Sequence, residues 1–292
     1  MSTTVYRGYT ADELGRQYDV ETAVSNLSQL MAGYQDRSDA VRARGDAKLD
    51  IAYGPHKLQR LDVFSPPDTI NAPIQIYIHG GYWRSSSKNG RAFPAEAFNA
   101  VGVVWIPIDY RLLPEVSLDA IVHDVRLAVA WVYENAASFG GDATRIHVSG
   151  TSAGGHLTAM LLLDGWQGGY GLPVDVIKGG CAISGLFDLE PLRHIKENRT
   201  LRLDDGLILR NSPMNHIPVT QRSLIVAWGE KESDEFKRQS REFAAAWRKR
   251  NSPVEGIELA GHDHFSAIAE TADPNGVLLS AIFAQMGLSS RA

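Results

Sequence analysis

The stretch Ile146-His147-Val148-Ser149-Gly150-Thr151-Ser152-Ala153-Gly154-Gly155-His156-Leu157 joins a short apolar run, a turn of small residues and the start of an apolar helix. The turn contains G-x-S-x-G as Gly150, Ser152 and Gly154. A serine between a buried strand and a helix sits on a strained turn with its hydroxyl at the tip. The flanking glycines are needed because a Cβ would collide with the strand and the helix. This pattern predicts Ser152 as a nucleophile, and a glycine-rich loop with a capping serine is the alternative.

The composition is that of an ordinary globular protein, with 292 residues of which 44% are hydrophobic and 22% charged. The net charge of -5 gives no indication of a nucleic-acid or anionic-membrane partner. Cys181 is the only cysteine, which excludes an internal disulfide and suits a reducing compartment. Residues 1–20 lack the features of a signal peptide, and no apolar run approaches the ~20 residues of a membrane span. We therefore expect a cytoplasmic protein without membrane or nucleic-acid partners.

Predicted strands and helices alternate through most of the chain, which indicates an α/β fold with a mainly parallel sheet and helices on both faces. We expect one domain over residues 1–292, with an N-terminal arm and helix in 1–50. The less regular segment 184–220 is expected to be a lid or a pocket wall. The main strands are expected at residues 74–78, 103–108, 146–148, 176–183, 223–227 and 254–259. In such a sheet the functional residues follow the carboxyl ends of the strands.

The end of the strand at 74–78 carries a motif suited to binding a negative charge. His79-Gly80-Gly81 follows this strand, and two glycines let the backbone approach a ligand closely. The N–H groups of Gly80 and Gly81, together with that of Ala153, are expected to form an oxyanion hole. A simple glycine turn is the alternative. We expect His79 itself to be a hydrogen-bonded support.

Two later strand ends carry candidates for the base and the acid that a serine nucleophile requires. His262 and His264 follow the last predicted strand, and the sequence pattern allows either of them to be the base. Glu230, Glu232 and Asp234 follow the preceding strand, and Asp234 also suits a helix N-cap. The chain order of serine, acid and histidine is that of α/β-hydrolases.

Other chemistries receive less support from the residues. His262 and His264 have the alternating spacing of a ligand pair, but no clear third ligand accompanies them, so we expect no metal. Cys181 lies inside a predicted strand, where a cysteine is usually a small buried apolar group. We expect no cofactor, and we leave open whether the protein is a homodimer.

Four motifs together resemble the hormone-sensitive-lipase-like group of α/β-hydrolases: HGGYW at 79–83, DYRL at 109–112, GGDATRI at 140–146 and GTSAGGHL at 150–157. Within that group the sequence is most similar to the kynurenine formamidase (arylformamidase) branch. The features typical of this branch are HGGYW, LRLD at 201–204, SDEFKRQS at 233–240 and DHF at 263–265. The resemblance covers nearly the whole chain from about Tyr53 and implies an α/β-hydrolase fold.

The resemblance also implies roles for the remaining candidates. The family's base directly precedes the phenylalanine of an H-F pair, which corresponds to His264. Its acid lies three residues before the pair Glu235-Phe236, which corresponds to Glu232, where the animal enzymes have aspartate. The resemblance implies a serine hydrolase.

We therefore expect Ser152 to cleave a small N-formyl aryl amide or a short ester, with Tyr82, Trp83 and the 184–220 segment lining an aromatic-friendly pocket. A broad-specificity carboxylesterase of short acyl esters is the first alternative. A non-catalytic ligand-binding protein with a hydrolase fold is an alternative from another class.

Overall fold

The central sheet of the computed structural model, which describes residues 3–288, has eight strands in the order β10-β9-β8-β7-β5-β6-β4-β3. Neighbouring strands from β10 to β6 are parallel, whereas β4 and β3 are antiparallel additions at one edge. This arrangement is the α/β-hydrolase fold, as predicted from the sequence. The strands are β3 (Lys48–Ala52), β4 (Arg60–Val63), β5 (Ala72–Ile78), β6 (Val104–Ile108), β7 (Gly141–Thr151), β8 (Ile177–Ile183), β9 (Ser223–Gly229) and β10 (Val254–Leu259).

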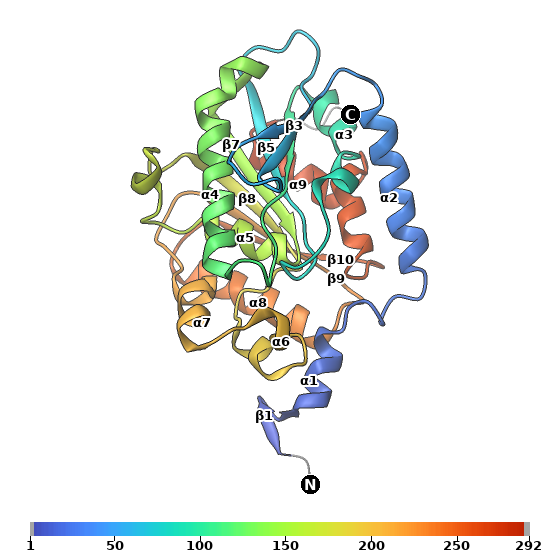
Figure 1. Cartoon of the computed structure of the whole chain (residues 1–292), viewed down its shortest axis with the longest axis vertical. Helices are drawn as coiled ribbons and strands as arrows, with labels where there is room; N and C mark the ends of the chain where they lie inside the picture. Colours follow the sequence, from blue (N-terminus) through green and yellow to red (C-terminus); the bar gives the residue numbers. More distant parts are fainter. Residues whose placement is uncertain (1–2, 289–292) are drawn as a thin grey trace.

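Helices cover both faces of this sheet (Figure 1). One face packs against α4 (Leu118–Asn135), α5 (Ala153–Leu161) and α8 (Asp234–Lys249). The other face packs against α2 (Leu27–Arg42), α3 (Ala95–Ala100) and α9 (Val277–Gln285). The two apolar faces follow from the alternation of side chains along each strand.

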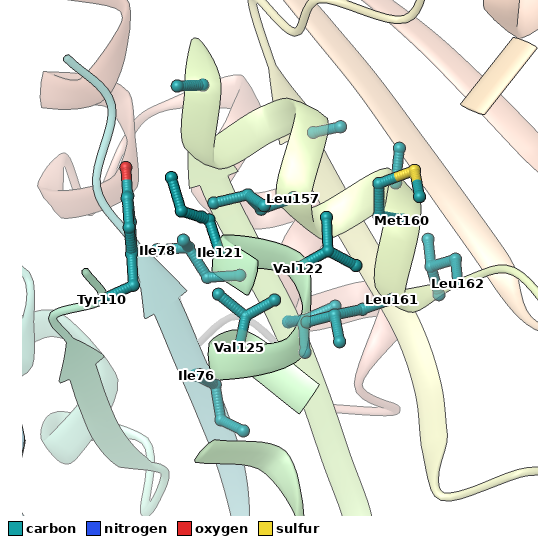
Figure 2. Close-up of a cluster of buried hydrophobic side chains, with 14 of the residues drawn as sticks. Ile76, Ile78, Tyr110, Ile121, Val122, Val125, Leu157, Met160, Leu161 and Leu162 are labelled. Carbon is teal, nitrogen blue, oxygen red and sulfur yellow. The ribbon is translucent and has the colours of Figure 1, made fainter. Parts of the chain in front are cut away.

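Strand β5 shows this alternation most clearly. Its Ile76 and Ile78 belong to the cluster on the α4 and α5 face, whereas Tyr77 belongs to the cluster on the opposite face. Figure 2 shows the two isoleucines near Val125 of α4 and Leu157 of α5. All these side chains are fully buried, so β5 and its two helices form a rigid support for the loops at the ends of the strands.

The chain reverses direction across the sheet at β5. From β5 it runs through the 3-10 turn η1 (Lys88–Arg91) and α3 to β6 on one side, and then through α4 to β7 on the other side. The loops that follow β5 and β7 therefore lie side by side at a topological switch point, where ligands bind in open α/β sheets. These loops contain Gly80, Gly81 and Ser152.

The N-terminal arm is attached to α8 (Figure 1). It consists of β1 (Thr4–Tyr6), β2 (Tyr9–Thr10) and α1 (Ala11–Tyr18). Tyr18 is buried and its hydroxyl donates to Glu235 of α8 at 2.9 Å, and Ser233 Oγ donates to the Gln17 carbonyl at 2.6 Å. Residues 19–26, which we call the N-terminal turn, then lead to α2. The long helix within the expected N-terminal region 1–50 is α2, and it begins at Leu27.

The 184–220 segment folds into short helical pieces with a buried apolar side. These pieces are η4 (Glu190–His194), α6 (Asn198–Leu201), α7 (Asp205–Asn211) and η5 (Pro213–Asn215). The buried apolar residues include Leu186, Phe187, Leu189, Leu192, Ile195, Leu201, Leu203 and Ile208. Among residues 3–288, no helix has the length and apolar character that a bilayer crossing requires.

Candidate active site

Ser152 occupies a strained turn between β7 and α5. Its backbone has φ 59° and ψ -120°, a conformation that non-glycine residues rarely adopt. Its N–H donates to the Ile183 carbonyl at 2.8 Å, which holds the turn against the end of β8. A Cβ on Gly154 would lie 2.0 Å from the Ile78 carbonyl oxygen, and one on Gly150 would lie 2.4 Å from the Gly154 oxygen. The glycines are therefore required by close backbone approach, as the sequence predicts.

Ser152 and His264 line the same cavity, which encloses about 550 Å³ of empty space, part of it open to solvent. Both side chains are nearly buried, at 5% relative exposure each. No hydrogen bond joins Ser152 Oγ to the His264 ring in the part of the chain that the structure describes. The remaining lining residues include Gly80, Gly81, Thr151, Arg84, Arg91, Phe265 and Ile268.

Glu232 faces His264 and does not itself line the cavity. Its Oε2 is 3.7 Å from His264 Nδ1, and both atoms are buried without another partner. The other carboxylate oxygen, Oε1, accepts from the Gly229 N–H at 3.0 Å and from the Ser184 hydroxyl. Glu232 is thus held at one oxygen, while the other faces the imidazole just beyond hydrogen-bond distance.

The competing acids and the competing histidine lie elsewhere. Asp234 is 81% exposed and its Oδ1 is 3.7 Å from Lys237, and the N-cap of α8 is its neighbour Ser233. Glu230 is exposed and accepts from the Gly261 N–H at 2.7 Å. His262 Nε2 faces Glu270 at 3.2 Å, and His262 does not line the cavity. Of these alternatives, the structure brings only His264 and Glu232 together beside Ser152.

The loop after β5 brings Gly80 against the serine turn. A Cβ on Gly80 would lie 3.1 Å from the Ser152 Cβ and 2.8 Å from the Thr151 carbonyl oxygen. Gly81 has φ 97°, and a Cβ there would lie 2.3 Å from the Ser85 oxygen. The N–H groups of Gly80 and Gly81 donate to no acceptor within residues 3–288, and Ala153 begins α5, where an N–H has no acceptor inside the helix. These three donors remain available for a ligand.

Tyr82 and Trp83, which the sequence predicts to line the pocket, take different places in the structure. Both have positive φ values, 50° and 56°, which turn the loop sharply after Gly81. Tyr82 lines the cavity, but its hydroxyl donates to the Tyr18 carbonyl at 2.7 Å. Trp83 is fully buried, and its indole N–H donates to His156 Nδ1 at 3.2 Å. The prediction that Trp83 contacts the substrate is therefore wrong, because the strained loop turns the indole into the core.

His79 supports this loop from behind and does not line the cavity. Its Nδ1 is 2.8 Å from the Gly80 carbonyl oxygen and its Nε2 is 3.4 Å from Asp109. The ring stacks on Tyr110 with 4.3 Å between centroids. Asp109 also accepts from the Lys88 N–H at 2.6 Å. The imidazole thus holds the glycine loop against the end of β6.

The cavity is covered by the N-terminal segment and not by residues 184–220, contrary to prediction. Val20 and Glu21 of the N-terminal turn and Met31 of α2 line it, and no residue of 184–220 does so. The 184–220 segment buries most of its own leucines, whereas the N-terminal turn lies at the cavity. Tyr34 of α2 also donates to the Phe265 carbonyl at 3.1 Å, next to His264. Residues 19–31 mix polar and apolar side chains without a motif, so the sequence gives no signal for this contact.

The sequence also raised a cysteine nucleophile and a metal site as candidates. Cys181 is buried on β8, and burial raises the pKa of its thiol, so the unreactive protonated form is favoured. His262 and His264 point to different carboxylates, Glu270 and Glu232. Within residues 3–288 no group of three or more side chains is arranged to hold a metal ion.

His156 connects the serine helix to both surrounding segments. Its Nδ1 accepts from the Trp83 indole, which is only a donor, so the ring is neutral with its proton on Nε2. Nε2 donates to the Asn211 carbonyl at 2.7 Å. Burial lowers the pKa of His156 to about 4. The neutral ring therefore ties α5 to the loop after β5 and to α7.

We expect His156 to make the fold less stable as the pH falls. In the unfolded chain a histidine takes up a proton below about pH 6.5, whereas the buried His156 stays neutral to about pH 4. The unfolded state therefore binds more protons in this window, and stability falls by about 2 kcal/mol between pH 7 and pH 5. Urea unfolding at both pH values measures this difference. The His156→Gln variant should be less stable than the wild type, and its stability should depend on pH by about 2 kcal/mol less over this range. His216→Gln, at an exposed histidine, should keep the pH dependence of the wild type. An unchanged pH dependence in His156→Gln would contradict the assignment.

Residues 61–168 match the protein family described as BD-FAE. This range contains the glycine loop and Ser152 but neither Glu232 nor His264. Kynurenine formamidase from Danio rerio is 29% identical over 299 residues, which cover 97% of this chain and 99% of that protein. Esterase LipQ from Mycobacterium tuberculosis is 30% identical over 243 residues, or 76% of this chain and 58% of that protein.

Solved structures are similar over most of the chain. The crystal structure of a candidate thioesterase from Silicibacter sp. TM1040 has a TM-score of 0.79 and 26% identity, and covers 92% of this chain and 98% of that one. An esterase from Thermogutta terrifontis with butyrate bound has a TM-score of 0.68 and 23% identity, and covers 85% of this chain and 97% of that one. The second similarity concerns the fold alone.

Proposed function

Because the chain is an α/β-hydrolase related to kynurenine formamidases and carboxylesterases, we propose that it cleaves a small N-formyl aryl amide or a short ester through an acyl-enzyme on Ser152. One observation carries the proposal: Ser152, on a strained turn, shares a cavity with His264, whose Nδ1 faces Glu232 at 3.7 Å. A hydroxyl, an imidazole and a buried carboxylate are the parts that serine acyl transfer needs.

In the first step His264 takes the proton of the Ser152 hydroxyl while Ser152 Oγ attacks the substrate carbonyl carbon. The hydrogen bonds of such a site are often long without substrate and shorten when it binds. The 3.7 Å between His264 Nδ1 and Glu232 Oε2 fits this behaviour, since both atoms are buried and lack other partners. Glu232 then holds the imidazole and stabilises its positive charge.

The negative charge that develops on the carbonyl oxygen is stabilised by the N–H groups of Gly80, Gly81 and Ala153. Their freedom from other acceptors supports this role, as does the packing of Gly80 against Ser152. His264 next gives its proton to the leaving amine or alcohol, and the acyl or formyl group stays on Ser152. Water, deprotonated by His264, then releases the acid and restores the serine. This chemistry requires no metal or cofactor.

The similar proteins include formamidases and esterases, so the substrate could be a formyl amide or a short ester. A small set of test substrates distinguishes these two classes. If the protein is a formamidase, we expect it to hydrolyse N-formylkynurenine or formanilide. We expect hydrolysis of p-nitrophenyl acetate and butyrate whether it is a formamidase or a carboxylesterase. The measurement is kcat/KM for each compound with purified protein. An undetectable rate with both formyl amides, beside readily measured ester hydrolysis, would leave the broad carboxylesterase alternative.

A further inference from the structure

The end of α1 lies between the loop that carries Glu232 and the glycine loop after β5. Gln17 and Tyr18 are the last residues of this helix. On one side they contact residues 233–235, which directly follow Glu232. On the other side Tyr18 contacts Tyr82, which directly follows Gly81. The N-terminal arm therefore connects two parts of the site that lie far apart in the sequence.

Four hydrogen bonds fix the end of α1 to the start of α8. Ser233 Oγ donates to the Gln17 carbonyl at 2.6 Å, and the Glu235 N–H donates to Gln17 Oε1 at 3.2 Å. The Tyr18 hydroxyl donates to Glu235 Oε2 at 2.9 Å and accepts from Gln239 at 2.8 Å. Tyr18, Glu235 and Gln239 are all buried, so water does not compete for their hydrogen bonds. The arm is thus attached directly beyond the proposed acid.

The backbone carbonyl of Tyr18 holds the loop after β5. It accepts from the Tyr82 hydroxyl at 2.7 Å and from the Val20 N–H at 3.1 Å. Tyr82 is buried, and burial raises the pKa of its hydroxyl, so this group stays protonated and remains a donor. The loop is therefore tied to the arm through the residue that follows Gly81.

The loop needs such a support because its backbone is strained. Gly81 has φ 97°, and the two residues after it, Tyr82 and Trp83, have φ 50° and 56°. A non-glycine residue with positive φ costs about 1–3 kcal/mol and persists only where its surroundings hold it. On the far side of the loop the Leu113 N–H donates to the Trp83 carbonyl at 2.9 Å. Without the hydroxyl of Tyr82, the near side of the loop loses its bond to the arm and can relax.

We propose that Tyr82 is a positioning residue for the oxyanion hole, and that the N-terminal arm holds it through the Tyr18 carbonyl. The attachment of α1 to α8 then helps to set where the N–H groups of Gly80 and Gly81 lie relative to Ser152. Such donors must be placed accurately, since a displacement of about 1 Å can cost on the order of 10²-fold in rate. The inference rests on the proposed function, because it concerns the donors of the same serine site.

The first test removes the Tyr82 hydroxyl and keeps the ring. With p-nitrophenyl acetate we expect Tyr82→Phe to lower kcat by about 5- to 50-fold and to change KM by less than threefold, because oxyanion donors act mainly in the transition state. A variant that only loosened the cavity would raise KM instead. Thermal unfolding shows whether the variant folds like the wild type.

Two ketones give a readout that depends on the oxyanion hole itself. Ser152 Oγ adds to the carbonyl carbon of 2,2,2-trifluoroacetophenone, His264 takes the proton, and the ketone oxygen becomes an oxyanion that the donors must stabilise. Acetophenone has nearly the same shape but binds without this addition. In Tyr82→Phe we expect the Ki of the fluorinated ketone to rise at least fivefold and that of acetophenone to change less than twofold.

Tyr18→Phe tests the other end of the connection. It keeps the carbonyl that Tyr82 contacts and removes the hydroxyl bond to Glu235, so kcat should fall by about 2- to 5-fold. Tyr18→Phe/Tyr82→Phe should be no slower than Tyr82→Phe alone, because the arm no longer reaches the loop. Tyr170→Phe is the matched control. Its hydroxyl bonds to His123 and it does not line the cavity, so kcat and both Ki values should stay at the wild-type level.

The outcomes separate the inference from the proposed function. A loss of kcat below fivefold in Tyr82→Phe, equal changes in the two Ki values, or additive losses in the double variant would overturn the positioning role while ester hydrolysis at Ser152 stands. No hydrolysis by the wild type, together with no fluorophosphonate labelling of Ser152, would remove the proposed function and the inference with it. Should Tyr82→Phe unfold, Tyr18→Phe decides, because it should still raise the Ki of the fluorinated ketone more than that of acetophenone.

Discussion

Ser152→Ala is expected to lower kcat for p-nitrophenyl acetate by on the order of 10⁴-fold or more, as loss of the nucleophile does in serine hydrolases. The physical reason is that alanine has no oxygen to form the acyl-enzyme, although the oxyanion donors and the cavity remain. The serine backbone already has φ 59°, so the alanine variant retains the strained turn and the Gly150 and Gly154 contacts. Steady-state hydrolysis measures the loss, and thermal unfolding shows that the variant folds.

Ser85→Ala is the matched control, because Ser85 also lines the cavity and carries a hydroxyl. Its Oγ donates to the Gly81 carbonyl at 3.1 Å, and it lies in an exposed part of the loop. We expect less than a tenfold change in kcat. A fluorophosphonate probe should label Ser152 in the wild type and in Ser85→Ala, but not in Ser152→Ala. A loss below tenfold in Ser152→Ala would end the nucleophile assignment, and no labelling at all would favour the non-catalytic alternative.

The sequence predicted the elements around Ser152 well because they depend on local physics. An apolar strand, a turn with glycines at fixed positions and a helix must produce a tight elbow, and the structure has it at Ser152. The strand of the elbow is longer than expected, since β7 starts at Gly141. The parallel sheet follows from the alternation of strands and helices, and it is observed from β10 to β6.

The errors concern contacts that no local pattern encodes. Trp83 follows Tyr82 with a positive φ, and nothing in HGGYW indicates that the indole turns inward to His156. Val20 and Glu21 lie in a polar segment, so their place at the cavity depends on the attachment of α1 to α8. Arg84 also lines the cavity. Its position directly after HGGYW is the sequence feature that could have indicated this.

The acid could not be chosen from residue spacing, because Glu230, Glu232 and Asp234 all follow β9. Glu232 is distinguished by two hydrogen bonds that its carboxylate accepts, one from the Ser184 hydroxyl and one from the Gly229 N–H. Ser184 comes 48 residues earlier, directly after β8. The family resemblance named Glu232, and the geometry offers an independent reason to test it.

Glu232→Gln is expected to lower kcat by on the order of 10²- to 10⁴-fold, whereas Asp234→Asn should change it by less than about threefold. Glutamine keeps the size of the side chain and the oxygen that accepts from Gly229 and Ser184. It loses the negative charge that stabilises the His264 imidazolium, and its amide would offer a donor where His264 Nδ1 needs an acceptor. Asp234 is 81% exposed in the first turn of α8, so its loss removes only a few tenths of a kcal/mol of helix-dipole stabilisation.

Glu232→Asp gives the decisive comparison because it keeps the charge and shortens the side chain by one methylene. If charge is what His264 requires, aspartate should recover at least tenfold of the kcat lost in the glutamine variant. The contacts to Gly229 and Ser184 hold Oε1, so the shorter side chain must give up one of them or move further from Nδ1. Recovery should therefore be partial. Equal kcat in Glu232→Gln and Glu232→Asp, with matched Tm values, would mean that packing and not charge is what this position supplies; a larger loss in Asp234→Asn would transfer the role of the acid to Asp234.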